Sequence, residues 1–186
     1  MMWLSSSTIA RLRDQLRERG RRPSALPAKV SPEVAEALSL VVEYGPLCEA
    51  MYLMMSADGK VSQEEREVLT GALRSLSGDA LRSAQIELLL DAAAKSVAEQ
   101  GREKRMQVVT SMLQEDPARA EVAFVLAAAV AFADNAIADA ENEMLDQLAI
   151  GLGIRDERAA ELLDSIEQDL GGDPTTRGPT FGVRGS

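Results

Sequence analysis

The stretch ADGKVSQEEREVL, residues 57–69, decides the fold because it recurs 76 positions later (133 − 57) as ADNAIADAENEML, residues 133–145. Five of the thirteen aligned positions are identical, including the alanine and aspartate that open each copy. Apolar segments of helical character flank both copies. A repeat at this spacing predicts two related helix–turn–helix hairpins packed about a pseudo-two-fold axis.

Each copy has the residues of a turn between two helices. Gly59 and Asn135 are the residue types that best tolerate a left-handed backbone. Ser62 and Glu65 match a capping box, in which the serine and the glutamate bind each other's backbone N–H. In the second copy no serine occupies the equivalent position, and Asp139 is the expected cap. These features alone give the turns a purely structural interpretation.

Outward from the turns, the chain is predicted to be all-α. Ala and Leu supply 51 residues and Val and Ile only 19, which favours helix over strand. We expect a compact bundle of about seven or eight helices. The expected segments lie near 7–19, 32–45, 47–55, 63–76, 80–100, 103–115, 117–132, 139–152 and 156–170.

The first segment of the main domain has one apolar face. Val34, Leu38, Val41 and Val42 repeat at helical spacing after a Ser-Pro pair that is typical of a helix start. Pro46 follows, and a proline inside a helix either breaks or kinks it. Both outcomes remain open from the sequence.

Composition shifts divide the chain into three parts. Residues 1–31 form a basic arm with a short helix and a Pro-rich linker, and residues 32–170 form the helical domain. The repeats are centred on 47–78 and 122–154. Residues 171–186 are rich in Gly, Pro and Thr and are expected to be a disordered tail.

The chain contains no histidine and one cysteine, Cys48. This composition excludes Ser-His-Asp and Cys-His catalysis, His-ligated zinc, Cys-rich metal sites and an intrachain disulfide. We identify no nucleophile–base pair and no phosphate-binding glycine loop, so we expect no enzyme and neither catalytic nor cofactor-binding residues. Cys48 lies in an apolar segment and is expected to be a buried thiol.

Charge is unevenly distributed along the chain. Residues 1–30 carry seven basic and two acidic side chains, or +5, and the remainder carries 13 basic and 28 acidic ones, or −15. An acidic body argues against nucleic acid as its ligand. The N-terminus lacks the features of a signal peptide, and the longest apolar run, 122–133, is too short to span a membrane. A cytoplasmic location is therefore expected.

The duplicated turns also suggest a site for a hard cation. Calcium and magnesium prefer carboxylate and carbonyl oxygens, which this histidine-free chain offers in number. The pattern argues against a self-contained EF-hand, because two anionic positions are missing from each loop. Between Arg119 and Arg155 the sequence has six acids and no basic residue, and such a cluster favours a cation or a basic partner. These acids are Glu121, Asp134, Asp139, Glu141, Glu143 and Asp146.

Both copies resemble the TerB family, a tellurite-resistance and stress-associated helical domain also found at the front of the DjlA co-chaperones. The resemblance rests on residues 57–65, on 133–141 and on the Leu-Gly-Ile motif at 152–154, within about 33–170. It implies an all-helical fold with duplicated hairpins, no enzymatic chemistry, and acidic residues that hold a metal ion. It also implies a role in membrane-associated or phage- and metal-stress complexes.

From the turns and the resemblance together, we predict a non-enzymatic acidic scaffold that binds calcium or magnesium and mediates protein interactions in a bacterial stress response. The predicted metal-ligating residues are Asp58, Glu65, Asp134, Glu141 and Asp139. The alternative is a metal-independent adaptor that contacts proteins or an anionic membrane surface through its basic N-terminal arm. The identity of the protein partner is left open.

Overall fold

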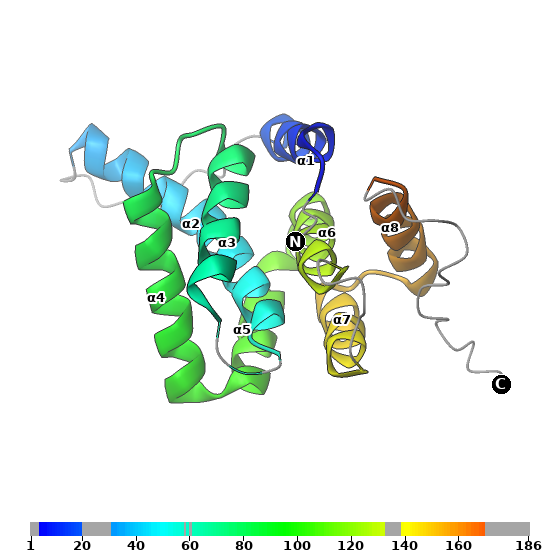
Figure 1. Ribbon diagram of the computed structural model, residues 1–186. Helices are drawn as coiled ribbons and strands as arrows, with labels where there is room; N and C mark the ends of the chain where they lie inside the picture. The colour runs from blue at the N-terminus through cyan, green and yellow to red at the C-terminus, as the bar shows by residue number, and fades with distance from the viewer. Residues whose placement is uncertain (1–3, 20–30, 58, 60, 133–138, 170–186) are drawn as a thin grey trace, which may run out of the picture.

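The computed structural model describes residues 4–19, 31–57, 59, 61–132 and 139–169, with the backbone alone at 139–141. These residues form helices and no strands, so the all-α prediction is confirmed (Figure 1). The helices are α1 (Ser6–Glu18), α2 (Pro32–Met55), α3 (Gln63–Ser77), α4 (Ser83–Gln100), α5 (Arg102–Leu113), α6 (Pro117–Phe132), α7 (Asp139–Leu152) and α8 (Asp156–Asp169).

The helix bounds follow local signals in the sequence. Ser31 caps α2 by accepting a hydrogen bond from the Val34 N–H at 3.4 Å, and Pro32 occupies the first turn. Gly78 ends α3 in the left-handed region, at φ 62°. The repeat is visible in the helix starts, because α3 begins at 63 and α7 begins 76 residues later at 139.

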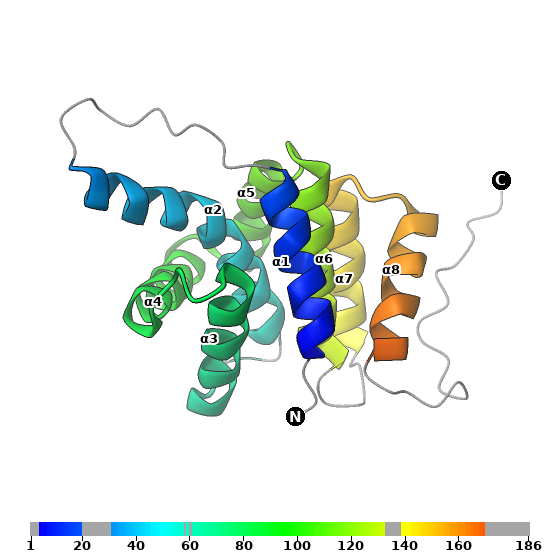
Figure 2. The ribbon, with the colours of Figure 1, turned by 90° about the horizontal axis from the view of Figure 1, so that it is seen from above.

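Helix α6 forms the centre of the bundle. Its residues from Val122 to Ala131 are all buried, and the helix contacts α1, α2, α5, α7 and α8. Figure 2 shows α1 and α7 on either side of it, with α8 beyond α7. The apolar run that the sequence assigned to a core helix therefore holds the two halves of the chain together.

Pro46 lies inside α2, yet the helix is continuous. A proline has no backbone N–H, so the carbonyl of Val42, four residues earlier, loses its usual intrahelical donor. Arg119 of α6 replaces it, because Nη2 donates to the Val42 oxygen at 2.8 Å and also to the Glu43 oxygen. Of the two open outcomes, a break at Pro46 is therefore wrong: the helix persists and its axis bends (Figure 2).

The apolar face predicted near the start of α2 does not join the core. Val34, Leu38, Val41 and Val42 are 50%, 40%, 40% and 57% exposed. Leu40 is the first buried residue of the helix, and it lies on the opposite side. Helical periodicity identified the helix correctly but not the face that packs.

The basic arm contributes a docked helix. Ile9, Leu12 and Leu16 of α1 are buried, and the helix packs against α3 and α6. Arg19 then pairs with Glu43 of α2 at 3.1 Å and with Asp116 before α6. The apolar side of α1 is thus covered by the bundle and is not available to a membrane surface.

The proposed three-part division remains a prediction, because the linker at 20–30 and the tail at 170–186 lie outside the described residues. The pseudo-two-fold relation of the hairpins is likewise an expectation from the sequence. Among the helices that the structure describes, none is both long enough and apolar enough to cross a membrane.

Candidate site at the duplicated acidic turns

The first turn joins the end of α2 to the start of α3. Gly59 has φ 147°, a value that L side chains rarely adopt, as expected for the glycine of this turn. Asp58, a predicted metal ligand, lies outside the described residues, as does Lys60. The structure therefore describes this turn at Ser56, Ala57 and Gly59 and again from Val61 onward.

Glu65 closes a capping box at the start of α3. Its Oε2 accepts a hydrogen bond from the Ser62 N–H at 2.6 Å, and the Ser62 hydroxyl accepts one from the Glu65 N–H at 3.2 Å. The structural interpretation of this residue is confirmed. The position of Glu65 is thus explained without a cation, and its role as a ligand remains a prediction.

The carbonyls at the end of α2 bind a guanidinium. Arg102, the first residue of α5, donates from Nη1 to the Ala57 oxygen at 2.9 Å and from Nη2 to the Ser56 oxygen. These two backbone oxygens are of the kind that a hard cation uses in a loop. An arginine 45 residues away in sequence therefore supplies positive charge at the first turn, and no spacing pattern pointed to it.

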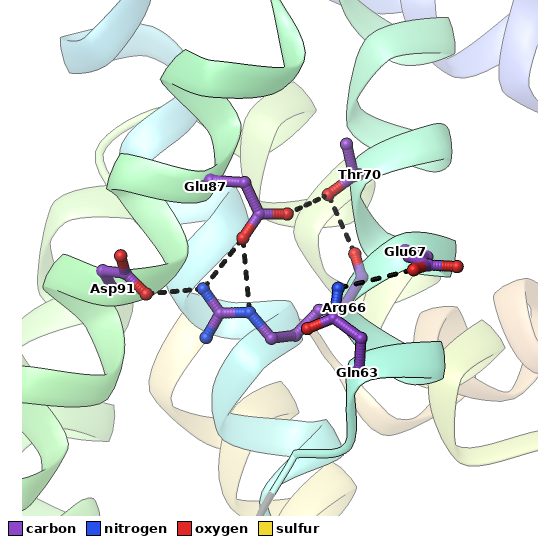
Figure 3. A network of polar contacts seen from close by, with 6 residues as sticks. All are labelled: Gln63, Arg66, Glu67, Thr70, Glu87 and Asp91. Atoms are coloured by element: carbon purple, nitrogen blue, oxygen red, sulfur yellow. Dashed lines mark hydrogen bonds and ion pairs between the residues drawn. The ribbon is translucent and has the colours of Figure 1, made fainter.

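Arg66, in the first copy of the repeat, binds acids of another helix. Its guanidinium crosses to α4, where it binds Glu87 at 3.0 Å and Asp91 at 2.6 Å (Figure 3). Thr70 joins the same network by donating to Glu87 Oε1 at 3.1 Å. This network joins α3 to α4.

Cys48 lies in the core of α2 near this network and is fully buried. Burial raises the pKa of its thiol to about 12, and the neighbouring Glu49 adds to the rise. A thiol that stays protonated is a poor nucleophile. The expectation of a buried thiol is confirmed.

The second turn is described only at its borders. Asp134 lies outside the described residues, and the structure gives the backbone but not the side chains of Asp139 and Glu141. Helix α7 begins at Asp139, the residue expected to cap it, so this residue lies in the first turn of the helix. The three residues remain predicted ligands.

The surrounding acids differ in how they are compensated. Glu121 has a basic partner from another helix. Its two carboxylate oxygens accept hydrogen bonds from Arg158 of α8, both at 2.8 Å. These hydrogen bonds lower the pKa of Glu121. For Asp146, partial desolvation and then the nearby Asp156 raise the pKa. One acid of the stretch is therefore paired with a basic residue of another helix, and a second lies near a further acid.

Asn142 adds one more oxygen close to the predicted ligands of α7. Its side-chain Oδ1 is buried and has no hydrogen-bond partner among the residues described. Buried amide oxygens are normally hydrogen-bonded, so this atom is an exception. Within the described ranges, however, no three or more acidic or cysteine side chains are close enough together to hold a metal ion.

A hollow of about 290 Å³ lies at the other end of α3, away from the acidic turn. Arg17 of α1, Glu43 and Tyr44 of α2, and Gly78 line it. The carboxylate of Glu43 is already paired with Arg19. This hollow is separate from the duplicated turns and adds nothing to a cation site there.

Comparison with known proteins gives one match. A family model described as tellurite resistance protein TerB matches residues 47–164, which are 118 (164 − 47 + 1) of the 186 residues. No curated protein and no solved structure matched the chain. The matched region begins directly after Pro46 and ends within α8, so it contains both acidic turns and excludes α1 and the first half of α2.

Proposed function

The chain belongs to the TerB family, and from this premise we propose that it is a non-enzymatic acidic scaffold that holds calcium or magnesium and binds partner proteins. The proposed setting is the cytoplasm of a bacterium, in a stress response of the tellurite-resistance type that the family name suggests. The proposed cation site is the second acidic turn, formed by Asp134, Asp139 and Glu141.

The observation that carries this proposal is the acidic stretch of α7, in which Asp146 has a raised pKa. No basic residue occurs between Arg119 and Arg155. Desolvation and Asp156 disfavour the ionised form of Asp146 and so raise its pKa. A divalent cation bound nearby would relieve that repulsion. The orphaned Oδ1 of Asn142 supports the same location, because amide oxygens are accepted ligands of calcium.

The first turn is the weaker candidate. The carboxylate of Glu65 binds the start of its own helix, and Arg102 binds the carbonyls of Ser56 and Ala57. A cation entering this turn would meet the positive charge of the guanidinium. The two copies of one motif are therefore proposed to have different roles, the first joining helices and the second binding an ion.

Calorimetric titration with calcium and with magnesium tests the proposal. We expect the wild type to bind with a Kd of about 10⁻⁴–10⁻³ M, as sites with few protein ligands do. Asp134→Ala should abolish the heat of binding, whereas Asp58→Ala, the matched change in the first copy, should leave it. No binding to the wild type at about 10 mM metal removes the cation from the proposal. Equal loss in both variants refutes the difference between the turns.

The stress role needs a test in cells. In a bacterium from which the gene has been deleted, the minimal inhibitory concentration of tellurite should fall, and the wild-type gene should restore it. Complementation with the Asp134→Ala variant separates the two clauses. Full rescue by this variant keeps the scaffold and removes the need for an ion, and an unchanged tolerance of the deletion strain removes the stress role.

A further inference from the structure

The first half of α2 projects from the bundle. In both ribbon views the start of this helix reaches beyond α4 (Figures 1 and 2). None of residues 31–39 is buried, although they continue the same helix as the fully buried Leu47 and Met51. Tertiary packing supplies most of the stability of helices in proteins. Two helical turns without such packing point to a contact that the described residues do not make.

The projecting half carries an apolar stripe, which we define as Val34, Leu38, Val41 and Val42. The spacing i, i+4, i+7, i+8 places all four on one side of the helix. Each is between 40% and 57% exposed. Leu40 and Tyr44, which pack into the bundle, lie on the other side of the same helix.

The stripe is continuous with an existing helix contact. Gly45 follows on the same side of α2, and a Cβ placed there would lie 3.9 Å from Leu89 Cδ2 of α4. The side of α2 that packs on α4 thus extends outward as the exposed stripe. The stripe also lies outside the region matched by the family model, so family membership does not account for it.

A second copy of the chain is a poor occupant for this surface. Half of four aliphatic side chains is on the order of 300 Å² of apolar surface, so the stripe supports a small contact with any occupant and area does not choose between them. Each copy carries a formal net charge of −10, which opposes self-association.

The charge around the stripe favours a basic occupant. Helix α2 has no Lys or Arg in its 24 residues; Glu43 and Glu49 are paired with Arg19 and Arg105, and Glu33 and Glu36 are the exposed acids of the projecting half. Glu33 and Glu36 lie on the same projecting half but not on the stripe. They would therefore attract a basic partner by long-range electrostatics and not by direct ion pairs. The chain already has such a contact in α1, an arginine-rich amphipathic helix whose apolar side packs on α3 and α6.

We propose that the stripe is the docking surface for a basic amphipathic helix of a partner protein. The partner's apolar residues lie along Val34, Leu38 and Val41, in the way that helices pack in coiled coils. Its Lys and Arg side chains face the acidic field of α2. The inference rests on the proposed scaffold role and names the surface and the chemistry of the partner.

A synthetic peptide provides the probe. We would measure the fluorescence anisotropy of a labelled 18-residue helix with Leu at the a and d positions and Lys elsewhere, and of a twin with Glu in place of Lys. The Lys peptide should bind the full chain with a Kd of roughly 10–100 μM, and the Glu twin at least tenfold more weakly. Raising the salt concentration should weaken binding of the Lys peptide.

Two variants with unchanged net charge locate the contact. Leu38→Ser should weaken binding of the Lys peptide at least tenfold, whereas Leu88→Ser, at a 70% exposed leucine of α4, should change it less than about twofold. Equal effects of the two variants, or tight binding of the Glu twin, overturn the proposal. Sedimentation that shows a dimer lost in Leu38→Ser overturns it in favour of a second copy.

The calcium titration separates this surface from the cation proposal, because Leu38→Ser should bind calcium like the wild type. Failure of the Lys peptide together with intact calcium binding refutes the docking surface and leaves the scaffold. Intact peptide binding in Asp134→Ala supports the surface independently of the ion.

Discussion

The contact between Arg119 and the backbone of α2 leads to a prediction about Pro46. The proline removes the N–H that would bind the Val42 carbonyl, and Arg119 Nη2 donates to that oxygen at 2.8 Å. If the arginine substitutes for the missing N–H, then restoring the N–H should make the arginine less necessary. The two substitutions Arg119→Met and Pro46→Ala should therefore compensate each other.

The magnitude follows from the burial of the site. Arg119 is 5% exposed, and a buried carbonyl left without a donor costs about 1–3 kcal/mol. We expect Arg119→Met to lower the free energy of unfolding by about 2–4 kcal/mol in the wild-type background. In the Pro46→Ala background the cost should be smaller by about 1–3 kcal/mol, because the backbone N–H restored by that substitution binds the Val42 carbonyl.

The assay is equilibrium urea unfolding of the four proteins, followed by circular dichroism and analysed as a double-mutant cycle. Any cavity left by the proline ring cancels, since both arms of the cycle contain it. Arg102→Met is the matched control, because Arg102 also binds two backbone carbonyls, those of Ser56 and Ala57 directly after α2, which have no proline four residues on. Its cost should be the same in the wild-type and Pro46→Ala backgrounds.

The cycle can fail in two ways. If Arg119→Met costs the same in both backgrounds, within about 0.5 kcal/mol, then Arg119 does not take the place of the N–H that Pro46 lacks. A cost of Arg102→Met that also falls in the Pro46→Ala background shows that the change acts on the whole helix and not on the Val42 carbonyl.

Three further predictions concern packing, pH and reactivity. Gly151→Ala should lower stability by about 1–3 kcal/mol in thermal or urea unfolding, because its Cβ would lie 2.8 Å from the Thr110 side chain, whereas Gly71→Ala, with nothing within 4 Å, should raise it by about 0.5–1 kcal/mol. The pKa of Glu121 is lowered in the folded chain, so its pairing with Arg158 stabilises the fold above about pH 4.5, and this stabilisation is lost as the pH falls through the folded-state pKa. Arg158→Met should therefore lower the free energy of unfolding by about 1 kcal/mol or less at pH 7 and leave it unchanged near pH 2. Cys48, with a pKa raised to about 12, should react with a thiol reagent at pH 8 only after urea is added, and rapid reaction of the native chain would contradict its burial.

The helices could be predicted from the sequence because their signals are local. Ser62 and Glu65 match a capping box that spans four residues. The structure contains that box, and α3 starts at Gln63, directly after Ser62. Gly78 likewise marks the end of α3 with a backbone angle that favours glycine. The 76-residue repeat needed only a comparison of the chain with itself.

The arginine contacts could not be predicted, because they join positions that are distant in sequence. Arg119 reaches a carbonyl 77 residues away, and Arg158 reaches Glu121 across 37. Pro46 marks the Val42 carbonyl as an acceptor without its intrahelical donor, but no sequence pattern identifies Arg119 as the residue that replaces that donor. The pair of Glu121 with Arg158 shows that a count of charges along the chain omits the pairing between helices.

The face of α2 that packs is a second feature that the sequence does not decide. Val34 and Leu38 repeat at helical spacing, and such spacing is more common on buried faces than on exposed ones. In α2 a second apolar side, which includes Leu40, faces the bundle. Periodicity cannot rank two apolar sides of one helix, and only the positions of α4 and α6 decide between them.

The dependence of α2 on Arg119 also has a consequence for synthesis on the ribosome. The arginine is added 73 residues (119 − 46) after the proline, which at about 5–20 residues per second means a delay of roughly 4–15 s. During that interval the nascent chain has the kinked helix but not the side chain that binds its open carbonyl. The bend in α2 therefore gains its full stability only after α6 has been made, and until then the Val42 carbonyl can bind water.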